Sequence, residues 1–259
     1  MRSFLSFTVL SSVMVFGLAA CSSFADPPDE IASDSAEEAS LVGGAENVDG
    51  SHTYFAISAD LRKCAFPTCG GWFLHRLNQP LTRCHDGQFA AMCYTPVLDW
   101  SEAGVSEALQ GKLLDAASQG ALSGDVDAIV RGRFAPTNST TPDPSLGRFV
   151  ITEAWQADGG APAQGAFVRV RDNGLACLVA PCPSITETTL NTSRVTDIAE
   201  IDWAPSGLSD REVSGQIDAM SAPGGILIAG DRFTVTGPGG TAKARTATAV
   251  YARLRDAAP

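Results

Sequence analysis

Pairs of cysteines with a shared spacing carry the clearest chemistry in the chain. The stretches "CAFPTC" (64–69) and "CLVAPC" (177–182) each enclose four residues between two cysteines, and each contains a proline. Cys84 and Cys93 form a third pair with a longer loop. Such cysteines form disulfides in oxidising compartments or bind zinc as thiolates. The zinc alternative would use the four cysteines of the first half, Cys64, Cys69, Cys84 and Cys93.

Few other residues have the spacing of a catalytic or metal site. The three histidines, His52, His75 and His85, show no metal-binding spacing, and the sequence contains no nucleophile elbow or phosphate-binding loop. "GPGGTAK" (237–243) is rich in glycine, but it joins two expected strands without opening a helix. This stretch therefore predicts a hairpin turn. We predict no catalytic residue, no metal and no cofactor.

Four landmarks recur in the same order in the two halves of the chain. "LDWSEAGVSE" (98–107) aligns without a gap on "IDWAPSGLSD" (201–210). The cysteine pairs recur as well, as do "GRFAPT" with "DRFTVT" and "TEAW" with "TAVY". Recurrence of this kind predicts two tandem related modules, 51–157 and 158–259. We interpret the repeated Asp-Trp units as scaffold and expect their tryptophans in the two cores: Asp99, Trp100, Asp202 and Trp203.

Each half reads β-β-β-α-β-β, so the predicted fold class is mainly β with one helix per repeat (α+β). This order resembles an OB-fold, which implies two small barrels. An open sheet with one helix packed on it is the alternative. Ser209 and Glu212 predict a capping box at the second helix. The expected strands are 53–61, 71–77, 93–100, 126–134, 148–155, 166–171, 185–190, 195–203, 226–235 and 246–253, with helices at 107–118 and 210–220.

The repeat selects among the fifteen pairings that six cysteines allow. The second half contains only Cys177 and Cys182, so a bridge closed within that half must join these two residues. The same spacing in the first half then implies a bridge between the cysteines of "CAFPTC", which leaves the third pair. The sequence predicts the disulfides Cys64–Cys69, Cys84–Cys93 and Cys177–Cys182.

The first twenty residues have the layout of a secretory signal. Arg2 is followed by an apolar run from Phe4 to Leu18, too short for a permanent transmembrane helix. The run ends in "LAAC" (18–21), which resembles the lipobox of bacterial lipoproteins. That resemblance implies cleavage before Cys21, an acyl (palmitate) anchor on Cys21 and, from Ser22, sorting to the outer membrane. An ordinary signal peptide followed by a chance cysteine is the alternative.

Residues 21–50 form an acidic segment behind the expected anchor. Positions 22–50 contain eight carboxylates and no basic residue, so we expect a disordered tether. The whole chain has a formal charge of −11, and residues 51–259 keep only −4 of it. No basic patch indicates nucleic acid as a partner.

One family resemblance rests on three stretches of the first half. "CAFPTCGG", "TRCHDG" and "CYTPVLDW" resemble a family of bacterial surface lipoproteins with a domain of unknown function. The resemblance is close from Thr53 to Trp100 and loose beyond. It implies no activity, ligand or catalytic residue. The second half departs from the pattern, since Pro181 stands directly before Cys182 and no Gly-Gly follows.

These observations favour a lipid-anchored cell-envelope protein that binds or organises an envelope or extracellular partner without catalysis. An inhibitor or accessory module acting on another protein is the second reading, and a hydrolase with unrecognised residues is the third. Aromatic residues crowd the first half more than the second. The candidate binding residues are Tyr54, Trp72 and Phe73, for which an ordinary aromatic core is the alternative.

Overall fold

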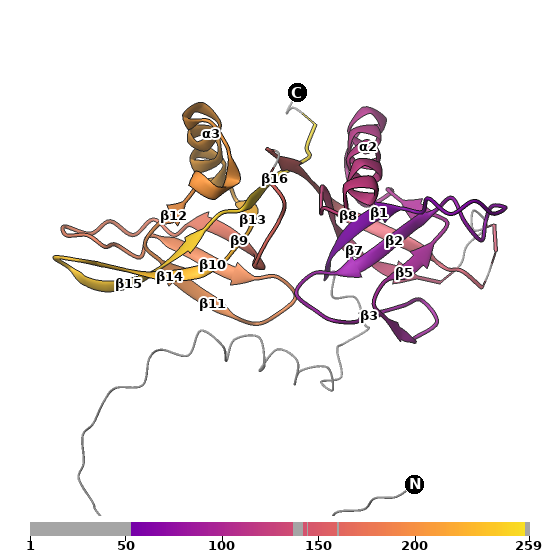
Figure 1. Cartoon of the computed structure of the whole chain (residues 1–259), viewed down its shortest axis with the longest axis horizontal. Helices are drawn as coiled ribbons and strands as arrows, with labels where there is room; N and C mark the ends of the chain where they lie inside the picture. The colour runs from indigo at the N-terminus through magenta and orange to yellow at the C-terminus, as the bar shows by residue number, and fades with distance from the viewer. Residues whose placement is uncertain (1–52, 137–141, 144, 160, 257–259) are drawn as a thin grey trace, which may run out of the picture.

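The computed structural model describes residues 53–136, 142–143, 145–159 and 161–256. The signal, Cys21 and the acidic tether lie outside these residues, so those expectations stay predictions. Figure 1 shows an extended arrangement of strands with helices α2 and α3 on one side, one over each half.

The described residues of the first half form the helix α2 and eight strands, several of them very short. Its elements are β1 (Thr53–Ala59), β2 (Trp72–Arg76), β3 (Thr82–Arg83), β4 (Phe89–Ala90), β5 (Cys93–Thr95), β6 (Leu98–Asp99), α2 (Glu107–Ser123), β7 (Ala128–Ala135) and β8 (Arg148–Asp158).

In the second half, the part of the chain that the structure describes forms α3, a short 3₁₀ helix and eight strands. Its elements are β9 (Ala166–Asp172), β10 (Ile185–Thr189), β11 (Val195–Ile198), β12 (Ile201–Asp202), η2 (Ala204–Ser206), α3 (Asp210–Met220), β13 (Ile226–Gly230), β14 (Arg232–Gly237), β15 (Gly240–Thr246) and β16 (Ala249–Arg253).

The main sheet has the strand order β11-β10-β9-β13-β16-β8-β7-β1-β2-β5, with β6 beside β8. Its central pair, β16 with β8, joins the two halves in antiparallel register. Outward from this pair run β7, β1, β2 and β5 on one side, and β13, β9, β10 and β11 on the other. A three-stranded sheet, β12-β15-β14, and a β3-β4 hairpin complete the fold.

The sheets of the described residues are open, so the expectation of closed barrels is wrong. Closure of one half would require its last strand to pair with an outer strand of the same half. Strands β8 and β16 instead pair with each other across the halves. The mainly β class with a helix in each half is confirmed.

Buried side chains form three clusters on the two faces of the main sheet. Helix α2 covers the first with Leu113 and Ala117, and α3 covers another with Met220. The third contains no helix residue and combines side chains of both halves, among them Tyr54, Trp155 and Tyr251. We call this third cluster the central core. It is the place where the two halves share one apolar interior.

Local chemistry explains where the observed elements differ from the expected ones. Helix α2 continues five residues beyond 118 and contains the buried Gly120, where a Cβ would lie 2.6 Å from the Asp125 carbonyl oxygen. It ends at Gly124, whose φ of 86° is left-handed. The expected strand 93–100 is two short strands, since Pro96 between them lacks an N–H to donate. Helix α3 begins and ends as predicted.

A buried ionic group ties the three-stranded sheet to the main sheet. Glu187 of β10 is fully buried and accepts hydrogen bonds from Arg232 Nε at 2.8 Å and Arg245 Nη2 at 2.9 Å. These arginines belong to β14 and β15. Breaking a buried pair of this kind is strongly destabilising, because it leaves an uncompensated charge inside the protein. The β14-β15 hairpin is therefore held in a fixed place.

Candidate functional site

Two disulfide-closed loops occupy equivalent places between the first two long strands of each half. We call residues 60–71, between β1 and β2, clasp 1, and residues 173–184, between β9 and β10, clasp 2. Clasp 1 closes through Cys64–Cys69 and clasp 2 through Cys177–Cys182, with Cα–Cα distances of 5.6 Å in both. Each loop contains one cis peptide bond before proline, Phe66–Pro67 and Ala180–Pro181.

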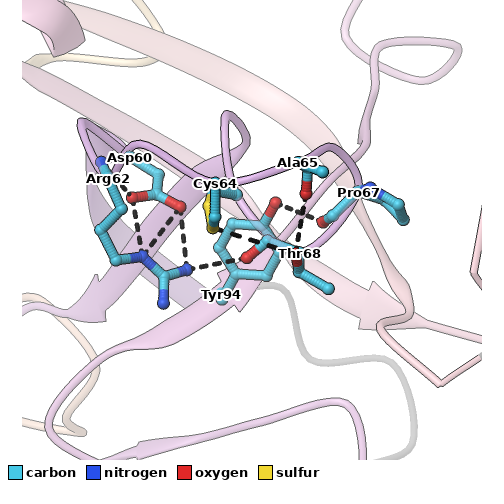
Figure 2. The surroundings of a disulfide bond; sticks show 8 residues. Asp60, Arg62, Cys64, Ala65, Pro67, Thr68 and Tyr94 are labelled. Atoms are coloured by element: carbon cyan, nitrogen blue, oxygen red, sulfur yellow. Dashed lines mark hydrogen bonds and ion pairs between the residues drawn. A yellow bond between two sulfur atoms is a disulfide. The ribbon is translucent and has the colours of Figure 1, made fainter.

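Clasp 1 is held by hydrogen bonds as well as by its disulfide, as Figure 2 shows. The Tyr94 hydroxyl donates to the Pro67 carbonyl at 2.6 Å, which ties the loop to β5. Within the loop, the Thr68 hydroxyl donates to the Ala65 carbonyl at 2.7 Å. These bonds fix the loop around Phe66, whose side chain stays 60% exposed.

An ion pair closes the base of clasp 1 (Figure 2). Arg62 donates to both carboxylate oxygens of Asp60 at 2.9 Å and to the Thr68 carbonyl at 3.0 Å. Its guanidinium lies 5.1 Å from the ring centroid of Phe73 and 5.4 Å from that of Tyr94. The hydrogen bond from Arg62 lowers the pKa of Asp60 below its usual value. The fully buried Asp60 carboxylate is thus ionised at neutral pH.

Clasp 2 rests on the three-stranded sheet instead. The Gly239 N–H, in the β14-β15 turn, donates to the Ala180 carbonyl at 2.8 Å. A Cβ at Gly237 or Gly239 would lie 2.9 or 3.0 Å from the same oxygen, so the close approach requires glycine at both positions. "GPGGTAK" is a hairpin turn, as predicted, and its glycines also seat clasp 2.

The third disulfide, Cys84–Cys93, connects the β3-β4 hairpin to β5. The three bridges are those that the sequence predicts, and two of them join the four cysteines that the zinc alternative would use. Within the described residues, no group of three or more histidine, cysteine or acidic side chains could hold a metal ion.

Exposed apolar side chains concentrate on the disulfide-tied loops. Of the eleven large hydrophobic residues exposed in the described part of the chain, eight lie inside a disulfide loop or within three residues of a bridged cysteine. Leu178, in clasp 2, is fully exposed. The eight residues are Leu61, Phe66, Leu81, Phe89, Met92, Leu175, Leu178 and Val179. Loops fixed by disulfides therefore carry most of the exposed large apolar side chains of the described residues.

Comparison with known families matches residues 53–257 to the model described as Domain of unknown function (DUF6748). The chain belongs to this family. Searches of curated proteins and of solved structures gave no match. Among the described residues of this DUF6748 domain, no helix is long and apolar enough to cross a membrane.

The predicted binding residues of the domain lie in three different environments. Tyr54 is buried in the central core and is only 7% exposed. Trp72 is half-buried and packs against the core under α2. Phe73 is half-buried and contacts the edge of the Tyr94 ring beside Arg62. Of the three predicted binding residues, Phe73 is therefore the one that lies at the base of clasp 1.

The repeated Asp-Trp units have matching roles in the domain. The Asp99 carboxylate accepts the Ser101 N–H at 3.0 Å, and the Asp202 carboxylate accepts the Ala204 N–H at 3.1 Å. Trp100 and Trp203 are each half-buried against the core beneath the helix of their own half. These contacts agree with the scaffold interpretation.

Sequence reasoning missed two asparagines that connect the halves. Asn78 follows β2 and Asn191 follows β10, and both have left-handed φ angles, 58° and 62°. Asn78 bonds to the backbone of Phe167, the second residue of β9, and Asn191 bonds to that of Tyr54, the second residue of β1. The signal was present as a repeated Leu-Asn dipeptide after the second strand of each half.

Proposed function

We propose that this protein is a lipid-anchored, non-enzymatic binding protein of the cell envelope that contacts a partner through its two clasps. The observation that carries the proposal is the concentration of exposed apolar side chains on loops fixed by disulfides. A loop ordered before binding loses little conformational entropy when it meets a partner. The "LAAC" sequence at 18–21 supports an anchor at Cys21, with the outer membrane as the destination.

We also propose that the halves are tandem related modules. The strand order outward from the β8-β16 pair supports this, because the same succession of pairings occurs on each side. The two disulfide-closed clasps, the left-handed asparagines and the Asp-Trp turns support it further. Figure 1 places β5 and the β14-β15 hairpin, against which the clasps pack, at opposite ends of the long axis. Two distant clasps suit a repetitive surface or two partner molecules.

The inhibitor reading is a second candidate, and Leu178 favours it. This side chain is fully exposed inside a loop closed by a disulfide over five positions and buttressed by the β14-β15 turn. A single protruding apolar residue on such a loop is suited to enter the pocket of another protein. In that case clasp 2 alone would carry the affinity.

The proposal is tested by crosslinking and pull-down from intact cells that express the tagged chain. The clasp variants are Phe66→Ser and Leu178→Ser, and the matched control is Leu122→Ser, which changes an exposed leucine of α2 outside the clasps. We expect the partner to be recovered with wild type and the control and lost when both clasps are changed. Loss with Leu178→Ser alone indicates the inhibitor mode. Identical crosslinked species from wild type and the double clasp variant would refute the proposal.

A further inference from the structure

Four charged side chains gather beside the central core, on the sheet face opposite α2 and α3. Arg131 of β7 pairs in register with Tyr54 of β1 and with Glu153 of β8. Arg131 Nη1 lies 2.9 Å from the Glu153 carboxylate, and Arg253 Nη2 lies 3.5 Å from it. Arg169 of β9 lies close enough to influence the Tyr54 hydroxyl electrostatically. We call Arg131, Arg169, Arg253 and Glu153 the arginine cluster.

The charges of the arginine cluster do not balance. The cluster itself contains three guanidinium groups and one carboxylate, and Arg169 has no ion-pair partner among the described residues. The side chains of Arg131 and Arg253 are 35% and 28% exposed, so solutes can reach the cluster. An excess of two positive charges at a partly desolvated place attracts an anion.

Two buried hydrogen-bond donors next to these charges have no acceptor. Both side chains are more than nine-tenths buried, and neither Tyr54 Oη nor Trp155 Nε1 makes a hydrogen bond. The guanidinium of Arg131 lies 5.6 Å from the Tyr54 ring centroid, and that of Arg253 lies 5.7 Å from the Trp155 ring. Burial, followed by the charge of Glu153, raises the pKa of Tyr54, so its hydroxyl keeps the proton that it would donate. Unsatisfied buried donors are rare and require an explanation.

If the halves are the tandem modules proposed above, the strand register indicates that the fold does not need these charges. Under that relation, the pairs Tyr54–Arg131, Arg131–Glu153 and Trp155–Arg253 correspond to Phe167–Ala229, Ala229–Ala249 and Tyr251–Ala157. Arg169, which pairs with Leu227, corresponds to Ala56, which pairs with Ile129. Every charged position of the arginine cluster therefore has an alanine as its counterpart: Ala229, Ala249, Ala157 and Ala56.

We infer that the arginine cluster binds an oxyanion, a phosphate or carboxylate group of a ligand, which accepts hydrogen bonds from Tyr54 and Trp155. A phosphate or carboxylate has several acceptor oxygens and matches the planar fork of an arginine. It would compensate Arg169 and satisfy the two buried donors together. The oxyanion can belong to a free solute or to a lipid headgroup, since the chemistry of recognition is the same. This inference uses the proposed tandem relation of the halves and does not depend on the clasps.

The test uses NMR of the chain from position 21 onward, with Cys21→Ser to prevent lipidation. The chain has four tryptophans, so four indole N–H resonances are expected, and loss of one in Trp155→Phe assigns the resonance of Trp155. The probes are inorganic phosphate, succinate, and phosphatidylcholine vesicles with and without phosphatidate. We expect a saturable shift or broadening of the Trp155 resonance. An effect of the soluble anions identifies a free solute, and an effect of phosphatidate vesicles alone identifies a lipid headgroup.

Matched variants separate a specific site from general electrostatic attraction. Tyr54→Phe removes only the hydroxyl, and the fold accepts Phe167 at the corresponding position. We expect it to weaken binding about tenfold, since one hydrogen bond to a charged group is lost. Arg169→Ala should weaken binding at least as much, whereas Lys112→Ala on α2 removes the same charge and should change nothing. The inference is overturned if no probe affects the Trp155 resonance, or if Tyr54→Phe and Arg169→Ala bind like wild type.

Discussion

Asn191 offers the most direct test of how the two halves are joined. Its Nδ2 donates to the Tyr54 and Leu77 carbonyls at 2.8 and 2.9 Å, and its Oδ1 accepts the Tyr54 N–H at 2.8 Å. Asn78 makes the corresponding three bonds to the other half, at 2.7 to 3.0 Å. The side chain of each asparagine thus supplies hydrogen-bond partners to backbone groups of the opposite half, beside the start of β1 or of β9.

The cost of losing Asn191 follows from these contacts. Each hydrogen bond contributes about 1 kcal/mol net, so removal of the side chain should cost about 3 kcal/mol. Alanine at a φ of 62° adds about 1 kcal/mol of backbone strain, which glycine avoids. We expect Asn191→Ala to lower the free energy of unfolding by about 4 kcal/mol and Asn191→Gly by about 3 kcal/mol. Domains of this kind have about 5–15 kcal/mol in total.

Equilibrium unfolding in urea, followed by tryptophan fluorescence, measures both values. Because Asn78 and Asn191 bind opposite halves at one junction, wild type and both variants should unfold in a single transition. Asn78→Gly serves as the matched variant and should cost about as much as Asn191→Gly. A loss below about 1 kcal/mol for Asn191→Gly would contradict the reasoning. The reasoning would also be contradicted if the second half, expressed without the first half, were as stable as it is in the whole chain.

Two further predictions concern the anchor and clasp 1. Cys21→Ser should abolish acylation and release the protein from the membrane fraction; incorporation of a clickable palmitate into this variant would contradict the lipobox interpretation. Arg62 holds the pKa of Asp60 below its value in the unfolded chain. The ionised carboxylate therefore stabilises the fold above about pH 4, and this stabilisation is lost as the pH falls through the pKa of the folded state. Asp60→Asn should therefore show a flatter decline of melting temperature between about pH 5 and pH 2 than wild type, and an equal decline would count against the ion pair.

Local signals in the sequence predicted much of the fold, and non-local pairing limited the rest. Ser209 and Glu212 marked the start of α3, where the Ser209 N–H donates to the Glu212 carboxylate at 2.8 Å. The cysteine spacing marked the clasps. The prediction of closed barrels was wrong because the sequence of β8 does not indicate that it pairs with β16, nearly a hundred residues away.

Non-local packing also limited the prediction of the candidate site from the sequence. Tyr54 and Phe55 are neighbours in β1, so they point to opposite faces, yet both are buried. The main sheet has a core on each face, which removes the alternation that distinguishes an inner from an outer face. An aromatic residue expected at a binding surface therefore lies inside the protein. The arginine cluster was equally hidden, because its members come from four strands scattered between positions 131 and 253.

The proposed duplication separates residues that maintain the fold from residues that serve a ligand. Side chains that recur at corresponding positions, such as Asn78 with Asn191 and Asp99 with Asp202, bind backbone groups in both halves. Their role is accounted for by the scaffold. The arginine cluster is the opposite case, since each of its four positions corresponds to an alanine in the opposite half. The scaffold does not require these charges, and it does not satisfy the buried donors beside them. Both features are explained by a partner from outside the chain. Ligand searches should therefore begin at the sheet face of Tyr54 and Trp155.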